Sequence, residues 1–117
     1  MNKVVFEGKE IRCFYVGSQT WMCGKDVCTA LGYVSKSYQK CLDKLDIDNK
    51  KQLRDFTDEF KNEITHNDGL MYYLDEMGVI ELVMRCKFPS AKPFKRFLKS
   101  TFIAMRNSSY SLIDLKR

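Results

Sequence analysis

The sequence has no long apolar run, which is the first constraint on how the protein acts. No stretch approaches the roughly 18 apolar residues that a membrane-spanning helix needs, and the N-terminal "MNKVVFEGKE" lacks the apolar core of a secretory signal peptide. Hydrophobic residues still make up 44% of the 117 positions, which suits a packed core. These features predict a soluble intracellular protein, one domain over residues 1–117, with no membrane partner.

The sequence lacks the motifs in which side chains hold metals or perform catalysis. His66 is the only histidine, and the five cysteines are irregularly spaced, whereas a structural zinc takes about four ligands in a compact arrangement. There is no glycine-rich phosphate loop, and Asp26 and Cys28 have no base or oxyanion-hole motif near them. We therefore expect reduced, mostly buried thiols, no metal, no cofactor and no enzymatic activity.

Negative charge is missing from one long stretch near the C-terminus. Residues 85–106, "RCKFPSAKPFKRFLKSTFIAMR", hold seven lysines and arginines and no acid. Residues 85–117 carry nine basic residues against Asp114 alone, whereas residues 1–84 carry eleven against fourteen acids, so the net charge of +5 is polarised. A concentrated positive field attracts polyanions, chiefly nucleic acid or an anionic membrane surface.

The N-terminal part predicts a small antiparallel sheet. Residues 4–6, 10–16 and 20–23 are rich in strand-forming residues, and the second of these segments alternates with the period of a strand. Turn residues separate the three segments. Trp21 lies on the third segment, where we expect it to be buried with a hydrogen-bond partner for its indole N–H.

A helical pair is expected next. From about residue 24 the apolar spacing becomes helical, and Gly32 stands where a helix C-terminus favours a left-handed residue. Ser35 is a suitable N-cap for a second helix to about residue 45. Two helices joined by a glycine turn are typical of a helix-turn-helix. The apolar residues expected on one face of the second helix are Tyr38, Cys41, Leu42 and Leu45.

Residues 46–68 have no clean period and predict either strands on long loops or a frayed helix. Residues 69–74 indicate a buried strand. Asp75 can cap a following helix, which would carry three apolar residues on one side. These residues are Ile80, Val83 and Met84.

A last helix follows, because Pro89 ends the preceding one, Ser90 can cap the next, and Pro93 suits a first helical turn. At 100° per residue its sequence separates into two faces. The face expected in the core contains Phe94, Phe97, Leu98, Thr101, Phe102 and Met105. The opposite face contains Lys92, Lys95, Arg96, Lys99 and Arg106. Ile103 also lies on the basic side, either as an interface residue or without a role.

Two phrases resemble the signatures of the Bro-N domain, found at the N-terminus of the baculovirus repeated-ORF (BRO) proteins and in phage antirepressors. They are "WMCGKDVCTALGY", residues 21–33, and "GVIELVMRCKFPSAKPFKRFL", residues 78–98, and the resemblance covers about residues 4–106. Gly24 stands where the family usually has alanine, so the first helix is expected to start later, and Phe97 replaces the usual tryptophan. Because members often carry a C-terminal domain, this chain is expected to be an isolated domain or a short member.

The resemblance implies DNA binding in a viral or phage regulatory protein, within the host nucleus or cytoplasm or, for a phage, in the cytoplasm. We therefore predict an α+β fold: an N-terminal antiparallel sheet, a helix-turn-helix-like pair, a variable middle and a C-terminal helix pair. Its partner would be double-stranded DNA or, as a second choice, single strands; a homo-oligomer is left open. The alternative is an antirepressor-type protein-interaction module. The residues assigned to DNA binding are Lys36, Gln39, Lys40, Arg85, Lys87, Lys92, Lys95, Arg96, Lys99 and Arg106.

Overall fold

The computed structural model describes residues 2–56 and 68–114, with the backbone alone at residue 68 and at residues 105–114. Five strands form one antiparallel sheet in the order β1-β2-β3-β5-β4. The strands are β1 (Asn2–Phe6), β2 (Lys9–Val16), β3 (Gln19–Cys23), β4 (Lys50–Gln52) and β5 (Tyr72–Leu74). The helices are α1 (Gly24–Leu31), α2 (Tyr38–Asp43), α3 (Glu76–Arg85) and α4 (Ala91–Asp114). The α+β prediction is confirmed.

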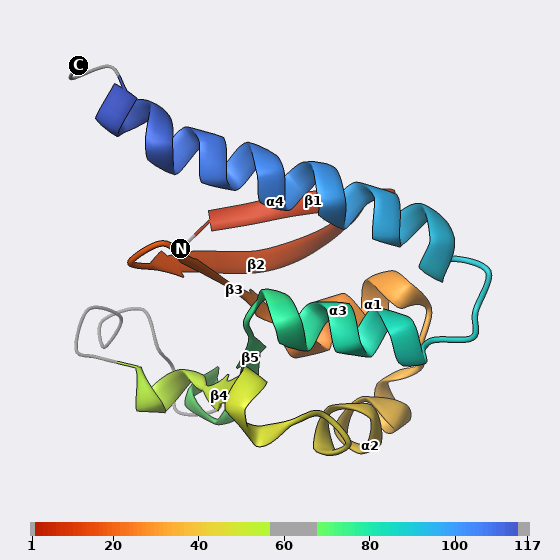
Figure 1. Cartoon of the computed structure of the whole chain (residues 1–117). Helices are drawn as coiled ribbons and strands as arrows, with labels where there is room; N and C mark the ends of the chain where they lie inside the picture. Colours follow the sequence, from red (N-terminus) through yellow and green to blue (C-terminus); the bar gives the residue numbers. More distant parts are fainter. Residues whose placement is uncertain (1, 57–67, 115–117) are drawn as a thin grey trace.

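The helices cover one face of the sheet and enclose the main core. In Figure 1, α4 runs along the β1–β2 hairpin, while α3 lies near α1 and α2 is placed farther from α4. Ile11, Met22 and Leu74 reach this core from the sheet, and all three are fully buried. A sheet of such short strands would be only marginally stable alone. It is stabilised by burying its apolar face against the helices.

A second, smaller cluster lies on the opposite face of the sheet. Phe14 and Trp21 are directly opposed on β2 and β3, and Tyr73 lies on β5. Leu53, in the 3-10 turn Leu53–Asp55, packs against these side chains. Trp21 is buried as predicted, but its indole N–H has no hydrogen-bond partner within the described part of the chain. That part of the prediction is wrong here.

The helical pair departs from the prediction at its start and at its centre. α1 begins at Gly24 itself, where an added Cβ would lie only 2.8 Å from Leu42 Cδ2, so glycine lets α2 pack closely on this end. Gly32 has φ 99° and ends α1 in the left-handed conformation, as predicted. Ser35, however, does not cap α2: it begins a separate 3-10 turn, Ser35–Ser37, and α2 starts only at Tyr38.

The middle of the chain contributes one short edge strand, which agrees with the alternative of strands on long loops and not with that of a frayed helix. β4 pairs antiparallel with β5, with Lys51 opposite Tyr73. The 3-10 turns Ile47–Asn49 and Leu53–Asp55 flank β4. The remainder of the 46–68 prediction falls on residues 57–67, which lie outside the described part of the chain.

The C-terminal helix pair and the cap at its start are confirmed, with one change in detail. Asp75 caps α3, since its carboxylate accepts a hydrogen bond of 2.8 Å from Gly78 N. Ser90 does precede α4, but its hydroxyl donates to the Leu31 carbonyl at 2.6 Å and so satisfies the C-terminus of α1 instead. This bond fixes the start of α4 to the end of α1.

Candidate nucleic-acid interface

One face of α4 is held firmly in the core. Phe94, Leu98 and Phe102 are buried, with exposed fractions of 0%, 4% and 6%. The Phe94 ring meets the Phe6 ring of β1 edge-on, with centroids 4.9 Å apart. These three positions were predicted correctly, whereas Phe97 is only half-buried and packs against Phe6 at the rim. The side chain of Met105, also assigned to this face, lies outside the described residues.

The opposite side of α4 is a continuous basic surface. Lys92, Lys95, Arg96 and Lys99 are all exposed, and we call these four the α4 basic residues. None of them forms an ion pair with another residue in the described ranges. Because the buried face fixes the helix, these charges stand on a rigid support and two turns of helix separate the first from the last.

The basic surface continues into the link between α3 and α4. Lys87 is exposed there, after the end of α3. The basic surface was expected to contain no acid near its charges, but Arg85 does have an acidic partner. Its guanidinium pairs with Glu81 one helical turn earlier, with Nη2 3.1 Å from Oε2. Its charge is therefore partly neutralised. The side chain of Arg106, the last residue assigned to this surface, is outside the described part of the structure.

The residues assigned to the second helix form a separate group. Lys36 lies on the 3-10 turn, Gln39 and Lys40 lie on α2, and all three are exposed. The Gln39 side-chain amide already donates a hydrogen bond of 2.7 Å to Asp43 on the same helix. Figure 1 shows α2 well apart from α4. Gln39 and Lys40 on α2 therefore do not extend the surface formed by the α4 basic residues.

An ion pair orients α1, which lies between these two groups. The guanidinium of Arg12 on β2 donates to both carboxylate oxygens of Asp26, at 2.8 and 3.0 Å, and Arg12 N donates to the same carboxylate at 2.9 Å. The hydrogen bond to Asp26 raises the pKa of Arg12 above its ordinary value. Asp26 lies in the first turn of α1, where a carboxylate also favours the helix dipole. The contact anchors α1 to the sheet.

The cysteines have the character of core residues. Cys13, Cys23, Cys28 and Cys86 are buried, Cys41 is half-buried, and all five are free thiols. Burial raises the pKa of Cys28 to about 12 and the pKa of Cys13 and Cys23 to about 11, so these thiols are protonated at neutral pH. Within residues 2–56 and 68–104, no group of three potential ligands is arranged to hold a metal ion.

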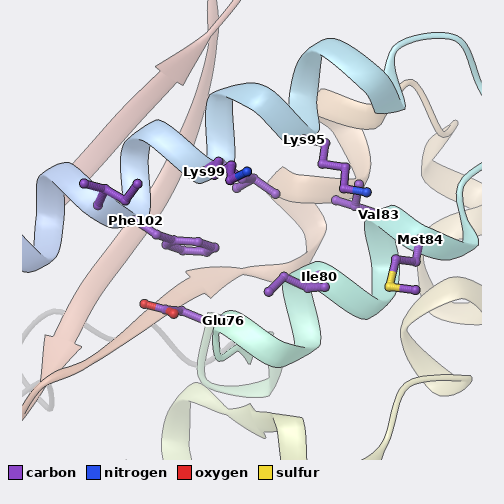
Figure 2. A pocket seen from close by; sticks show the side chains of 9 residues that line it. Glu76, Ile80, Val83, Met84, Lys95, Lys99 and Phe102 are labelled. Atoms are coloured by element: carbon purple, nitrogen blue, oxygen red, sulfur yellow. The ribbon is translucent and has the colours of Figure 1, made fainter.

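A groove between α3 and α4, next to the α4 basic residues, was not predicted. Its volume is about 400 Å³, and its lining is mainly apolar. Figure 2 shows Ile80 of α3 and Phe102 of α4 pointing into the space between the helices. Ile80 and Met84 do share a side with Val83, as predicted, but they are 39% and 73% exposed because this side faces the groove. Ile103, on the basic side of α4, was the one sequence signal of the groove.

No helix in the described portion is long and apolar enough to cross a membrane. The comparison with solved structures found no match.

The sequence matches one protein family and two curated viral proteins. Residues 10–104 match the family model described as the BRO family, N-terminal domain. Two proteins of Invertebrate iridescent virus 6, named as Bro-N domain-containing proteins 289L and 201R, are 31% and 32% identical over 104 and 88 residues. These matches cover 79% and 64% of this chain but only 25% and 21% of the relatives, so the chain spans about a quarter of their length or less. The chain belongs to the BRO family and carries its N-terminal domain.

Proposed function

We propose that residues 1–117 form a single, non-enzymatic DNA-binding domain of a viral regulatory protein, acting in the host nucleus or cytoplasm. In this proposal double-stranded DNA is held mainly through its phosphates, by the α4 basic residues and the α3–α4 link. The family membership supports a regulatory, DNA-binding role. The choice of surface rests on the geometry of α4.

The observation that carries the proposal is the opposition of two faces on one helix. Phe94 and Leu98 hold one side of α4 in the core, so the α4 basic residues are fixed relative to the whole domain. In the described ranges these bases have no ion-pair partner to displace, so a phosphate can approach them without breaking a pair. Each neutralised phosphate would release condensed counterions, which favours binding entropically.

The individual residues differ in what they can contribute. Arg96 can bind a phosphate bidentately, whereas Lys92, Lys95 and Lys99 act as compact point charges. Arg85 would contribute less because it is already paired with Glu81. Lys36 on the 3-10 turn and Lys40 on α2 would contact phosphates. Gln39 would contact a base edge, at the cost of its hydrogen bond to Asp43. These three residues would adjust the preference among DNA sequences, whereas most of the affinity for DNA would come from α4.

The proposal is tested by fluorescence anisotropy with labelled duplex DNA, single-stranded DNA and RNA. If the four α4 basic residues each neutralise one phosphate, affinity for duplex should fall by about two orders of magnitude between roughly 50 and 200 mM salt. Duplex should bind more tightly than either single strand. Absence of binding to all three at low salt, or binding that ignores salt, would contradict the proposal and favour the protein-interaction alternative.

A further inference from the structure

The groove between α3 and α4 leaves a large apolar surface uncovered. Met84, Ile103 and Ile80 line it with exposed fractions of 73%, 51% and 39%, and Val83 and Phe102 form its buried floor. Apolar residues exposed singly are ordinary on a protein surface, but a hollow that gathers several of them marks a site where another molecule removes them from water. The groove is therefore a candidate docking site.

The spacing of the lining residues indicates the shape of the occupant. α3 contributes Ile80, Val83 and Met84, which are spaced i, i+3 and i+4, and α4 contributes Leu98 and Phe102, spaced i and i+4. Two helices with such ridges enclose a furrow into which a third helix can place an apolar stripe. The lining between Lys95 and Ile103 extends about 12 Å along α4, which corresponds to rather more than two turns of a docked helix.

The charge of the rim indicates the chemistry of that helix. Lys95 and Lys99 line the groove along α4, whereas α3 contributes one acid, Glu76, so the lysines outnumber the acid. Figure 2 shows Lys95 reaching from α4 towards Val83 on α3. Neither lysine forms an ion pair with a described residue. A second copy docked groove to groove about a two-fold axis would bring four lysines and two glutamates to the same interface, so the repulsion between lysines would be only partly offset. An acidic partner is favoured instead.

We propose that the groove between α3 and α4 binds an amphipathic, acidic α-helix of a protein partner. The apolar stripe of this helix, at positions i, i+3 or i+4, and i+7, lies on Val83, Leu98 and Phe102. Its glutamates or aspartates face Lys95 and Lys99 along one edge. Binding covers Met84 and Ile103, the two most exposed apolar side chains of the groove. The groove needs no nucleic acid to bind this helix, but Lys95 and Lys99 also belong to the proposed DNA surface, so DNA and the acidic helix would compete for them.

The probe for this site is a synthetic helix of about 18 residues, constrained by lactam bridges, with leucines at the stripe positions and glutamates beside them. A second peptide has lysine at each glutamate position. Affinity for the full chain is measured by fluorescence anisotropy without DNA. The Met84 methyl resonance is followed in parallel, because it reports occupancy of the groove directly. Thermal unfolding of each variant checks that its fold is intact.

Two pairs of variants locate the binding site. The double variant Met84→Glu/Ile103→Glu should lower the affinity for the acidic peptide by at least about tenfold, because its carboxylates would be buried against the leucines of the peptide. Met77→Glu is the control on the same helix, since Met77 is 61% exposed and does not line this groove. K95A/K99A should lower the affinity for the acidic peptide about twofold to fivefold for each lysine–glutamate pair that is lost. K92A/R96A removes the same charge from α4 outside the groove lining and should leave the peptide affinity unchanged.

Four results would overturn the proposal. An unmoved Met84 resonance at saturating peptide would show that the groove is not where the peptide binds. Equal loss in K95A/K99A and K92A/R96A, or equal affinity for the lysine peptide, would reduce the interaction to diffuse charge or to apolar contact alone. A concentration-dependent dimer that M84E abolishes, with no peptide binding, would assign the groove to a second copy of the chain.

Discussion

α4 and α2 both present basic side chains to solvent, but they are supported very differently. α4 extends over 24 residues and is anchored by Phe94, Leu98 and Phe102, whereas α2 has six residues and only Leu42 is buried. A 3-10 turn precedes α2, and Gln39 is held by Asp43 within the helix. Under the proposed function, DNA affinity would therefore come mainly from charges on the long, anchored helix. The short helix would only adjust that affinity.

The anchor of α4 gives the largest expected effect. Phe94→Ala removes a fully buried ring that packs against Phe6 and should lower the free energy of unfolding by about 3–5 kcal/mol. Phe97→Ala, at the half-buried rim, should cost clearly less. Chemical denaturation measures both. Equal losses at the two positions would show that Phe97 stabilises the fold as much as Phe94, which its half-buried position at the rim contradicts.

The two basic groups can be compared through variants that remove the same charge. K92A/R96A should reduce the slope of log K against log salt for duplex DNA by about 1.8, which corresponds to two lost phosphate contacts. K36A/K40A, near and on α2, should reduce it by less than half as much. Fold stability should barely change in either case, because all four side chains are exposed. A larger loss from K36A/K40A would reverse the assignment.

The α2 end of the domain depends on one close backbone contact. A Cβ on Gly78 would lie 2.5 Å from the Asn49 carbonyl oxygen, in the turn that follows α2. Gly78→Ala should therefore destabilise the protein by about 1–3 kcal/mol, although alanine is the better helix former. Met77→Ala is the exposed control on the same helix. If Gly78→Ala leaves the slope of log K against log salt for duplex DNA unchanged, a shift of the backbone near α2 does not disturb the α4 surface. If Gly78→Ala and Met77→Ala are equally stable, the close packing at Gly78 is contradicted.

Thiol labelling gives the smallest and simplest comparison. Cys41 on α2 is half-buried, whereas Cys28 on α1 is buried with its pKa raised to about 12. At about pH 8 little thiolate forms at such a buried site, so reaction with a disulfide reagent should be fastest at Cys41. Cys41→Ser should remove the fast phase. A fast phase that survives this change would show that one of the buried thiols opens to solvent.

Much of the fold could be predicted because local signals agreed with the tertiary structure. The alternation in residues 10–16, the left-handed Gly32 and the cap at Asp75 each act through neighbouring residues, so the sequence displays them directly. Strands were one alternative for residues 46–68, but the position of β4 could not be predicted, since "KKQ" has no apolar alternation and forms a strand only through pairing with β5. Ser90 shows the same limit: its hydroxyl bonds to Leu31, which is 59 residues away in sequence.

The candidate site was predictable in charge but not in detail. The absence of acids from residues 85–106 located the α4 basic residues, and the helical period separated them from Phe94, Leu98 and Phe102. The pairing of Arg85 with Glu81 was missed, because the acid precedes that stretch by one helical turn. The groove was missed because Ile80 and Met84 have the spacing of core residues, and only the position of α4 relative to α3 exposes them.

The most direct test of the central claim compares two variants that each lose four basic residues. The first is K92A/K95A/R96A/K99A. The control is K9A/K44A/K51A/R54A, whose side chains are all exposed and lie elsewhere on the protein. Duplex affinity is measured over a range of salt concentrations. The first variant should bind weakly to every sequence, with a salt slope smaller by about 3.6, while the control stays close to the parent. Equal slopes for the two variants, or an unchanged affinity in the first, would contradict the assignment of the DNA surface to α4.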